Sequence, residues 1–160
     1  MKPLWTEAQK DIISFCAIEC RLQASGELSV GHMLEAWACA LARPRPSNLP
    51  IPHEFILQLG ALVEPHKNGS GYRTGYVRVG SNVKIPGRDV PPRMDNLLAN
   101  HAGRSAADWF HDYENIHPFL DGNGRTGAIL YNYLNGTLLQ PTWPPNFWSD
   151  PRRVSGFGAP

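Results

Sequence analysis

The chemistry of this chain is concentrated in one stretch, HPFLDGNGRTGAILYNYL at residues 117–134. Its second half repeats apolar residues at helical spacing, so a loop over 117–122 is expected to lead into the start of a helix. Gly122 and Gly124 allow backbone N–H groups to turn inward together, and the first helical turn adds unpaired N–H groups. The stretch therefore predicts a site for phosphate oxygens, and so for a nucleotide.

Three side chains of this loop have the chemistry that such a site needs. Arg125 can donate two parallel hydrogen bonds to phosphate oxygens. Asp121 is a hard oxygen ligand, suited to the Mg²⁺ that accompanies a di- or triphosphate. His117, with an ordinary pKa of about 6.5, can take a proton from an attacking hydroxyl group. Phe119 is expected to pack inward and hold the loop in place.

Helices are expected on the N-terminal side of this stretch. Apolar residues at spacings of three and four predict them at 6–23, 29–42, 55–63, 94–98 and 105–116. Pro86, Pro91 and Pro92 predict irregular backbone up to Met94. The segment 72–80 is aromatic, β-branched and preceded by a glycine-rich turn, which predicts a β-hairpin or an extended flap.

Length and composition exclude several classes of protein. The 160 residues suit one domain, and a hydrophobic share of 42% can build a core. Fifteen basic against 14 acidic residues leave a net charge of +1, which argues against disorder and against nucleic-acid or anionic-membrane binding. Apolar runs fall short of a membrane span, and residues 1–7 lack the apolar stretch of a signal peptide.

The cysteines indicate a reducing compartment. Cys16, Cys20 and Cys39 are an odd number in helical segments, which favours buried thiols in a cytoplasmic protein over a disulfide framework or a metal pair. We expect one domain over 1–160, with N-terminal helices at 1–50, a core with flap and motif at 51–139, and an irregular tail at 140–160. Trp143, Phe147 and Trp148 are expected to pack part of that tail.

The motif HPFLDGNGR resembles the signature HxFx(D/E)GNGR of the Fic (Fic/Doc) family without a gap. Residues 71–73 and 77–80 look like the flap of that family, and 90–94 resemble the segment that follows it. The resemblance covers about residues 51–135. It implies a mainly all-α fold, a helical bundle with a small β-hairpin flap.

The resemblance also implies an activity, transfer of AMP from ATP to a Ser, Thr or Tyr hydroxyl group of a target protein. His117 would be the general base, Asp121 would hold Mg²⁺, and Asn132 would contact the nucleotide base. The phosphates would lie on Gly122, Asn123, Gly124 and Arg125. The target would pair with the flap at Tyr76, Val77, Arg78 and Val79.

Ala128 departs from the family pattern, which has a second arginine three residues after the first. This difference leaves three alternatives open: a Doc-like protein kinase, a transferase that uses another nucleotide donor, or a Fic-like binding module without catalysis. Glycines at 122 and 124 favour nucleotidyl transfer, since the Doc-like loop tends to carry Ala and Lys there. The small size suits a toxin-like protein.

Control and metal chemistry complete the expectations. Many family members have an inhibitory helix with Ser or Thr four residues before a Glu, and no such spacing is found here. An antitoxin or another inhibitory partner in trans, or a different mechanism, is therefore expected to restrain the protein. The pair His111-Asp112, with His101 and Asp108 nearby, resembles the metal ligands of HD-type phosphohydrolases, but so short a pair arises often and metal hydrolysis is disfavoured.

Overall fold

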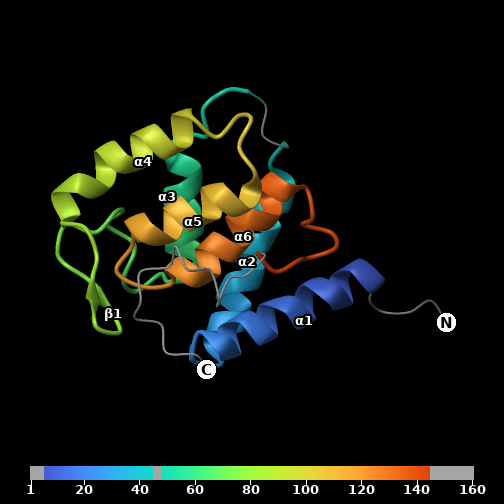
Figure 1. Ribbon diagram of the computed structural model, residues 1–160. Coiled ribbons are helices and arrows are strands. Elements are labelled where there is room, and N and C mark those ends of the chain that lie inside the picture. Colours follow the sequence, from blue (N-terminus) through green and yellow to red (C-terminus); the bar gives the residue numbers. More distant parts are fainter. Residues whose placement is uncertain (1–5, 45–47, 145–160) are drawn as a thin grey trace.

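Helix α6 (Asn123–Asn135) runs through the middle of the fold, and α2, α3 and α5 pack against it (Figure 1). The computed structural model describes residues 6–44 and 48–144. Every residue of α6 from Asn123 to Tyr133 is buried. A helix buried on all sides lies inside a core rather than on its surface. The start of α6, which carries the motif, is therefore held on several sides by other elements.

Three N-terminal helices form one side of the bundle, with α2 and α3 packed on α6 and α1 packed on α2. They are α1 (Glu7–Leu22), α2 (Leu28–Ala42) and α3 (His53–Val63), close to the ranges that the sequence predicts. Thr6 caps α1: Gln9 N donates to Thr6 Oγ1 over 3.2 Å, and Thr6 N donates back to Gln9 Oε1 over 2.8 Å. Helix α2 packs against both α3 and α6 and supplies buried side chains such as Met33 and Trp37.

On the other side, α5 (Ala106–Ile116) packs on α6, and α4 (Val90–Ala99) packs on α5. A short 3₁₀ turn, η1 (Gly87–Asp89), precedes α4. The prediction of irregular backbone up to Met94 is wrong, because Pro91 and Pro92 lie in the first turn of α4. Backbone N–H groups of a first turn have no acceptor within the helix, so proline, which lacks the N–H group, is tolerated there. Ser105 caps α5 by accepting from Asp108 N over 3.0 Å.

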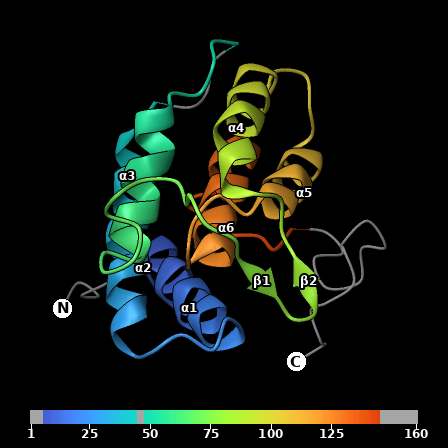
Figure 2. The same cartoon turned by 90° about the vertical axis from the view of Figure 1, so that its left-hand side faces the viewer.

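The hairpin consists of β1 (Arg78–Val79) and β2 (Asn82–Val83), paired antiparallel with Arg78 opposite Val83. Figure 2 shows it projecting beside the ends of α5 and α6. It begins later than the predicted 72–80 segment. Residues 72–77 are not strand, because Arg73 N donates to Pro118 O over 2.9 Å rather than to a neighbouring strand.

The structure confirms the predicted fold class, a mainly helical bundle with one small hairpin. Cys16 and Cys20 are buried, and burial raises the pKa of the Cys16 thiol to about 12, so it is protonated at neutral pH. Trp143 stacks on Phe15 at 4.1 Å between ring centroids, whereas 147 and 148 lie outside the described residues. Within 6–44 and 48–144, no helix has the length and apolar character that a membrane span requires.

Candidate active site at the α5–α6 turn

The turn between α5 and α6 begins and ends in left-handed backbone. His117 ends α5 with φ 53°, and Gly122 precedes α6 with φ 70°. The proline at 118 disfavours helical backbone at His117, which explains why α5 stops there. Only glycine adopts the conformation at 122 without strain. The motif therefore folds as a tight loop that ends on the N-terminus of α6.

The side chain of Asn123 fixes the shape of the loop. Its Nδ2 donates to Phe119 O over 2.9 Å, and its Oδ1 accepts from Phe119 N over 2.9 Å. The Phe119 ring is fully buried beneath α3, as predicted, and a methyl group added at Gly60 would lie 2.3 Å from it. Both polar atoms of the Asn123 side chain thus bind the loop, and only the main chain of Asn123 is left to bind a ligand.

Arg73 ties the segment before the hairpin to the same loop. Its Nε donates to His117 O over 2.6 Å and its Nη2 donates to Ile116 O over 3.0 Å, while its side chain is buried. Two guanidinium nitrogens on successive carbonyl groups leave the end of α5 little freedom to shift. The sequence placed residue 73 in a flap and contained no sign of this contact.

His117 is held in a buried, positively biased environment. Its side chain is 13% exposed, and its Nδ1 lies 3.8 Å from Glu114 Oε2. Burial, together with the nearby charges of Lys84 and Arg73, lowers the His117 pKa to about 3. The imidazole is consequently neutral at neutral pH, which is the state that can accept a proton.

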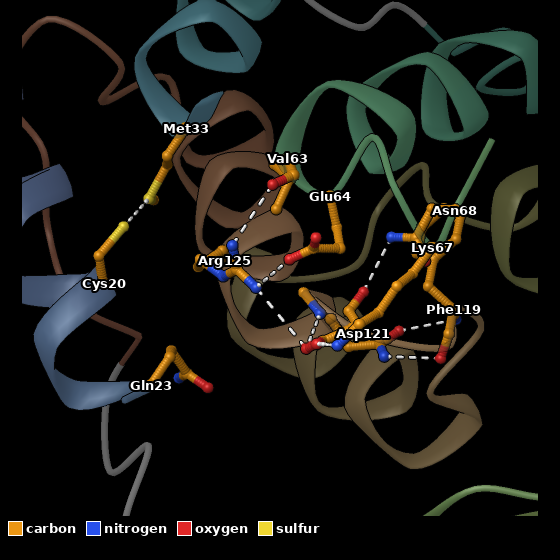
Figure 3. Close-up of polar contacts among 12 residues, drawn as sticks. Cys20, Gln23, Met33, Val63, Glu64, Lys67, Asn68, Phe119, Asp121 and Arg125 are labelled. Atoms are coloured by element: carbon orange, nitrogen blue, oxygen red, sulfur yellow. Dashed lines mark hydrogen bonds and ion pairs between the residues drawn. The ribbon is translucent and has the colours of Figure 1, made fainter. Parts of the chain in front are cut away.

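Asp121 lies at the mouth of the turn with both carboxylate oxygens in use. Oδ1 accepts from Gly122 N over 2.7 Å, and Oδ2 accepts from Lys67 Nζ (Figure 3). Burial opposes the charged form, but the hydrogen bonds from Lys67 and Gly122 outweigh it and lower the Asp121 pKa. The carboxylate is ionised and 40% exposed, so it fits the role of a single protein ligand for a nucleotide-bound Mg²⁺.

Arg125 lies deeper than a surface phosphate clamp would. Its side chain is 4% exposed, and its Nη1 donates to Val63 O over 3.3 Å. Nη2 donates to Glu64 Oε2 over 3.2 Å and lies 3.6 Å from Asp121 Oδ1. The buried Nε has no hydrogen-bond partner among the described residues. Arg125 is thus a fixed positive charge under the turn with one donor still unused.

Comparison with known proteins agrees with this geometry. The family model of the Fic/DOC family matches residues 50–134. The chain belongs to the Fic/DOC family. Its fold is similar to that of a Fic family protein from Desulfovibrio desulfuricans G20, with a TM-score of 0.66 at 16% identity. The match covers 82% of this chain and 51% of that one, so the chain spans about half the length of the solved structure.

The C-terminal end of α1 covers the start of the Fic motif helix. A methyl group added at Gly124 would lie 2.6 Å from Gln23 Nε2, which donates to Glu19 Oε1 over 3.0 Å. Figure 3 shows Gln23 on the blue ribbon of α1, opposite Arg125. Sequence reasoning missed this contact because it searched for a Ser or Thr four residues before a Glu, and neither Gln23 nor Glu19 meets that spacing.

One predicted site residue of the Fic domain, and one position that departs from the family pattern, lie in the interior. Asn132 is fully buried: its Nδ2 donates to Ala128 O and Thr142 O, and its Oδ1 accepts from Thr137 Oγ1 and Thr142 N. Asn132 thus has a structural role at the end of α6, and its contact with the nucleotide base stays a prediction. Ala128, where the family has a second arginine, is part of the hydrophobic core.

The predicted flap residues are on the hairpin side of the Fic domain. Tyr76 is 70% exposed, Arg78 is exposed, and Val77 and Val79 are half-buried. His111 contacts Asn115 instead of a metal ligand set. Across the described part of the chain, no three His, Cys, Asp or Glu side chains gather closely enough to hold a metal ion.

Proposed function

We propose that this Fic domain transfers AMP from ATP to a hydroxyl group of a target protein. One observation carries the proposal: the neutral imidazole of His117 and the N-terminus of α6 are the two ends of one rigid turn, with the ionised Asp121 between them. A base that can take a hydroxyl proton thus lies beside backbone N–H groups suited to phosphate oxygens. Members of the family are transferases in general.

In the proposed reaction the hydroxyl oxygen of the target attacks the α-phosphorus of ATP. The new O–P bond forms as the bond to pyrophosphate breaks, and His117 takes the hydroxyl proton. Its Nδ1 is buried, so we assign the proton to Nε2. The main chain of Gly122, Asn123 and Gly124 and the charge of Arg125 would hold the phosphates. Positioning and charge stabilisation account for most of the acceleration in such transfers.

Mg²⁺ would be held by Asp121 together with the phosphates of the nucleotide. When bound, the ion offsets phosphate charge. Asp121 is suited to this because its lowered pKa keeps it ionised, and because one of its oxygens is occupied only by an exposed lysine. The protein thus needs to supply a single carboxylate.

The target would add an extended segment to the hairpin. Strand addition uses main-chain hydrogen bonds for affinity and side chains for selectivity. Tyr76 and Arg78 are exposed there and can supply that selectivity, while Val77 and Val79 support the hairpin from below. An inhibitory partner in trans is proposed as well, in a cytoplasmic, toxin-like setting.

Labelled ATP tests the proposal. The purified protein is incubated with candidate target lysate, Mg²⁺ and ATP labelled at the α- or the γ-phosphate. Label from the α-position on protein supports AMP transfer. Label from the γ-position alone would instead mean phosphoryl transfer, the Doc-like alternative left open by Ala128. Absence of both labels, with every triphosphate tried, would contradict catalysis and favour a binding module.

The matched variants are His117→Ala and His32→Ala. His117→Ala removes the base, and general-base catalysis contributes about 10²- to 10⁴-fold to a rate, so transfer is expected to fall by that amount. His32 is a histidine on α2, outside the motif turn, and its replacement is expected to leave transfer unchanged. Equal transfer by the two variants would contradict the role of His117.

A further inference from the structure

Lys67 lies at the mouth of the motif turn and binds Asp121, the predicted metal ligand. Among the described residues it is the one exposed cation that does so. Its side chain is 55% exposed and its Nζ donates to Asp121 Oδ2 (Figure 3). A lysine ammonium group is charged at neutral pH. It lies on the loop after α3, outside the HPFLDGNGR motif.

The backbone beneath Lys67 is fixed to the motif loop. The neighbouring Asn68 is buried, and its Nδ2 donates both to Gly60 O over 3.1 Å and to Asp121 O over 2.9 Å. Asn68 N also donates to Glu64 O over 3.0 Å. This buried amide links the loop after α3 to the turn, so the Lys67 side chain starts from a defined position beside Asp121.

The charges around the turn balance in the present arrangement. Arg125 faces Glu64 and Asp121, and Lys67 faces Asp121, so two cations meet two carboxylates. A nucleoside di- or triphosphate adds several negative charges, and binding it therefore requires a cation that can be released. Arg125 is buried and bonded to Val63 and Glu64, which leaves Lys67 as the mobile one.

Exchange of Lys67 from Asp121 costs little. An ion pair between exposed side chains is worth about 0–1 kcal/mol, because water screens it and two side chains must be ordered. Lysine carries a point charge on a flexible four-carbon stem with three donors, a group that binds phosphate without a fixed geometry. Phosphate oxygens can therefore replace the Asp121 carboxylate as its partner.

We propose that Lys67 is a phosphate-binding residue of the nucleotide site, and that its ammonium group leaves Asp121 for the β- and γ-phosphate oxygens when a di- or triphosphate binds. The released Asp121 oxygen is then open to the divalent cation. Lys67 thus favours nucleotides with two or three phosphates over a monophosphate. This inference rests on the proposed function, because it requires a nucleotide at the start of α6.

Calorimetric binding of ATP, ADP and AMP in the presence of EDTA tests the phosphate contact without metal or transfer. The proteins are the wild type, Lys67→Ala, Lys67→Gln and the control Lys10→Ala. Lys10 forms a comparable exposed ion pair with Glu7 on α1, over 2.7 Å. Because Gln23 covers Gly124, each protein is also measured in a Gln23→Ala background.

Both Lys67 variants are expected to bind ATP and ADP about five- to tenfold more weakly than wild type, which corresponds to about 1–1.4 kcal/mol. Their AMP affinity and all affinities of Lys10→Ala are expected to stay within about twofold. Lys67→Gln keeps a polar but uncharged side chain, so a loss of ATP and ADP affinity equal to that of Lys67→Ala assigns the effect to the charge of Lys67. ATP affinity that is unchanged in Lys67→Ala, or reduced no more than AMP affinity, overturns the proposal.

Titration of Mn²⁺ alone, followed by its paramagnetic resonance signal, tests the exchange at Asp121. Lys67→Ala is expected to bind Mn²⁺ about three- to fivefold more tightly than wild type, because the competing ammonium group is gone. Equal Mn²⁺ affinity overturns the exchange.

Failure of the two proposals can be told apart. A charge-dependent binding pattern without label transfer would contradict AMP transfer and leave the role of Lys67 standing. Label transfer, together with nucleotide binding that does not depend on Lys67, would support AMP transfer and contradict the role of Lys67. If no nucleotide bound in either background, the role of Lys67 would be wrong, while label transfer in Mg²⁺ would still decide AMP transfer.

Discussion

Gly60→Ala is expected to disturb the motif turn from the outside, through the packing of one ring. Gly60 lies on α3, and a methyl group there would come within 2.3, 2.5 and 2.7 Å of three ring atoms of Phe119. Carbon atoms in ordinary contact are about 3.5–4.0 Å apart, so the ring would have to retreat by roughly 1 Å. Phe119 is fully buried and its main chain is held by Asn123, which leaves the ring little room.

The net effect on stability follows from two opposing terms. Overpacking a core costs about 1–3 kcal/mol, and three close contacts with a fixed ring place this case at the upper end. Replacing glycine by alanine inside a helix contributes about 1 kcal/mol in the other direction. We therefore expect the free energy of unfolding to fall by about 2 kcal/mol. We expect transfer to fall by about 100-fold, since a shift of about 1 Å at a reacting group has that effect.

Urea unfolding, followed by tryptophan fluorescence, measures the stability term against a matched control. Gly31→Ala makes the same substitution in α2, where nothing lies within 4 Å of the added methyl group. That variant is expected to gain about 1 kcal/mol. Adding Phe119→Leu to Gly60→Ala should restore part of the stability, because the smaller side chain leaves space. If Gly60→Ala were stabilised as much as Gly31→Ala, the packing argument would be refuted.

Three further predictions concern the surroundings of the turn. Gln23→Ala removes the amide that covers Gly124, so the initial rate of label transfer should rise several-fold; an unchanged rate would show that Gln23 does not obstruct the site. Arg73→Lys replaces the planar guanidinium group by a single ammonium nitrogen, which does not reproduce the separate Nε and Nη2 bonds to the two carbonyl groups. Urea unfolding should therefore show a loss of about 2 kcal/mol, and an unmoved midpoint would contradict this role. His117 titrates at about pH 3 in the fold but at about 6.5 when unfolded. The unfolded chain therefore binds more protons between these values, stability falls on acidification, and about 2 kcal/mol should be lost from pH 6.5 to 5. His117→Ala should lack this pH dependence, and equal slopes in the two proteins would tell against it.

Much of the fold could be predicted from the sequence, because its signals are local. Apolar spacing, together with caps such as Thr6 and Ser105, locates the helices within a few residues. Pro91 and Pro92 gave a wrong boundary, since the same residue type is tolerated in the first turn of a helix and excluded from its interior. The hairpin was expected too early, because alternation alone does not say which residues find a partner strand.

The local properties of the motif can also be predicted from the sequence. Its residue types state which backbone is left-handed, which side chain can accept a proton and which can hold a cation. Those properties belong to residues 117–125, and neighbours in sequence are enough to express them. The turn that leads into the helix at 123 was thus predictable before any fold was known, and the roles of His117 and Asp121 stay predictions.

What surrounds the motif was decided only by tertiary structure. Gln23 on Gly124, Arg73 on the His117 carbonyl and Lys67 on Asp121 join residues that are 44 to 101 positions apart. Packing also produces the burial that lowers the His117 pKa and the burial that gives Asn132 its structural role. The periodicity of apolar residues determines which face of a helix is buried. Which polar groups from distant parts of the chain come into contact depends on how the helices pack against one another.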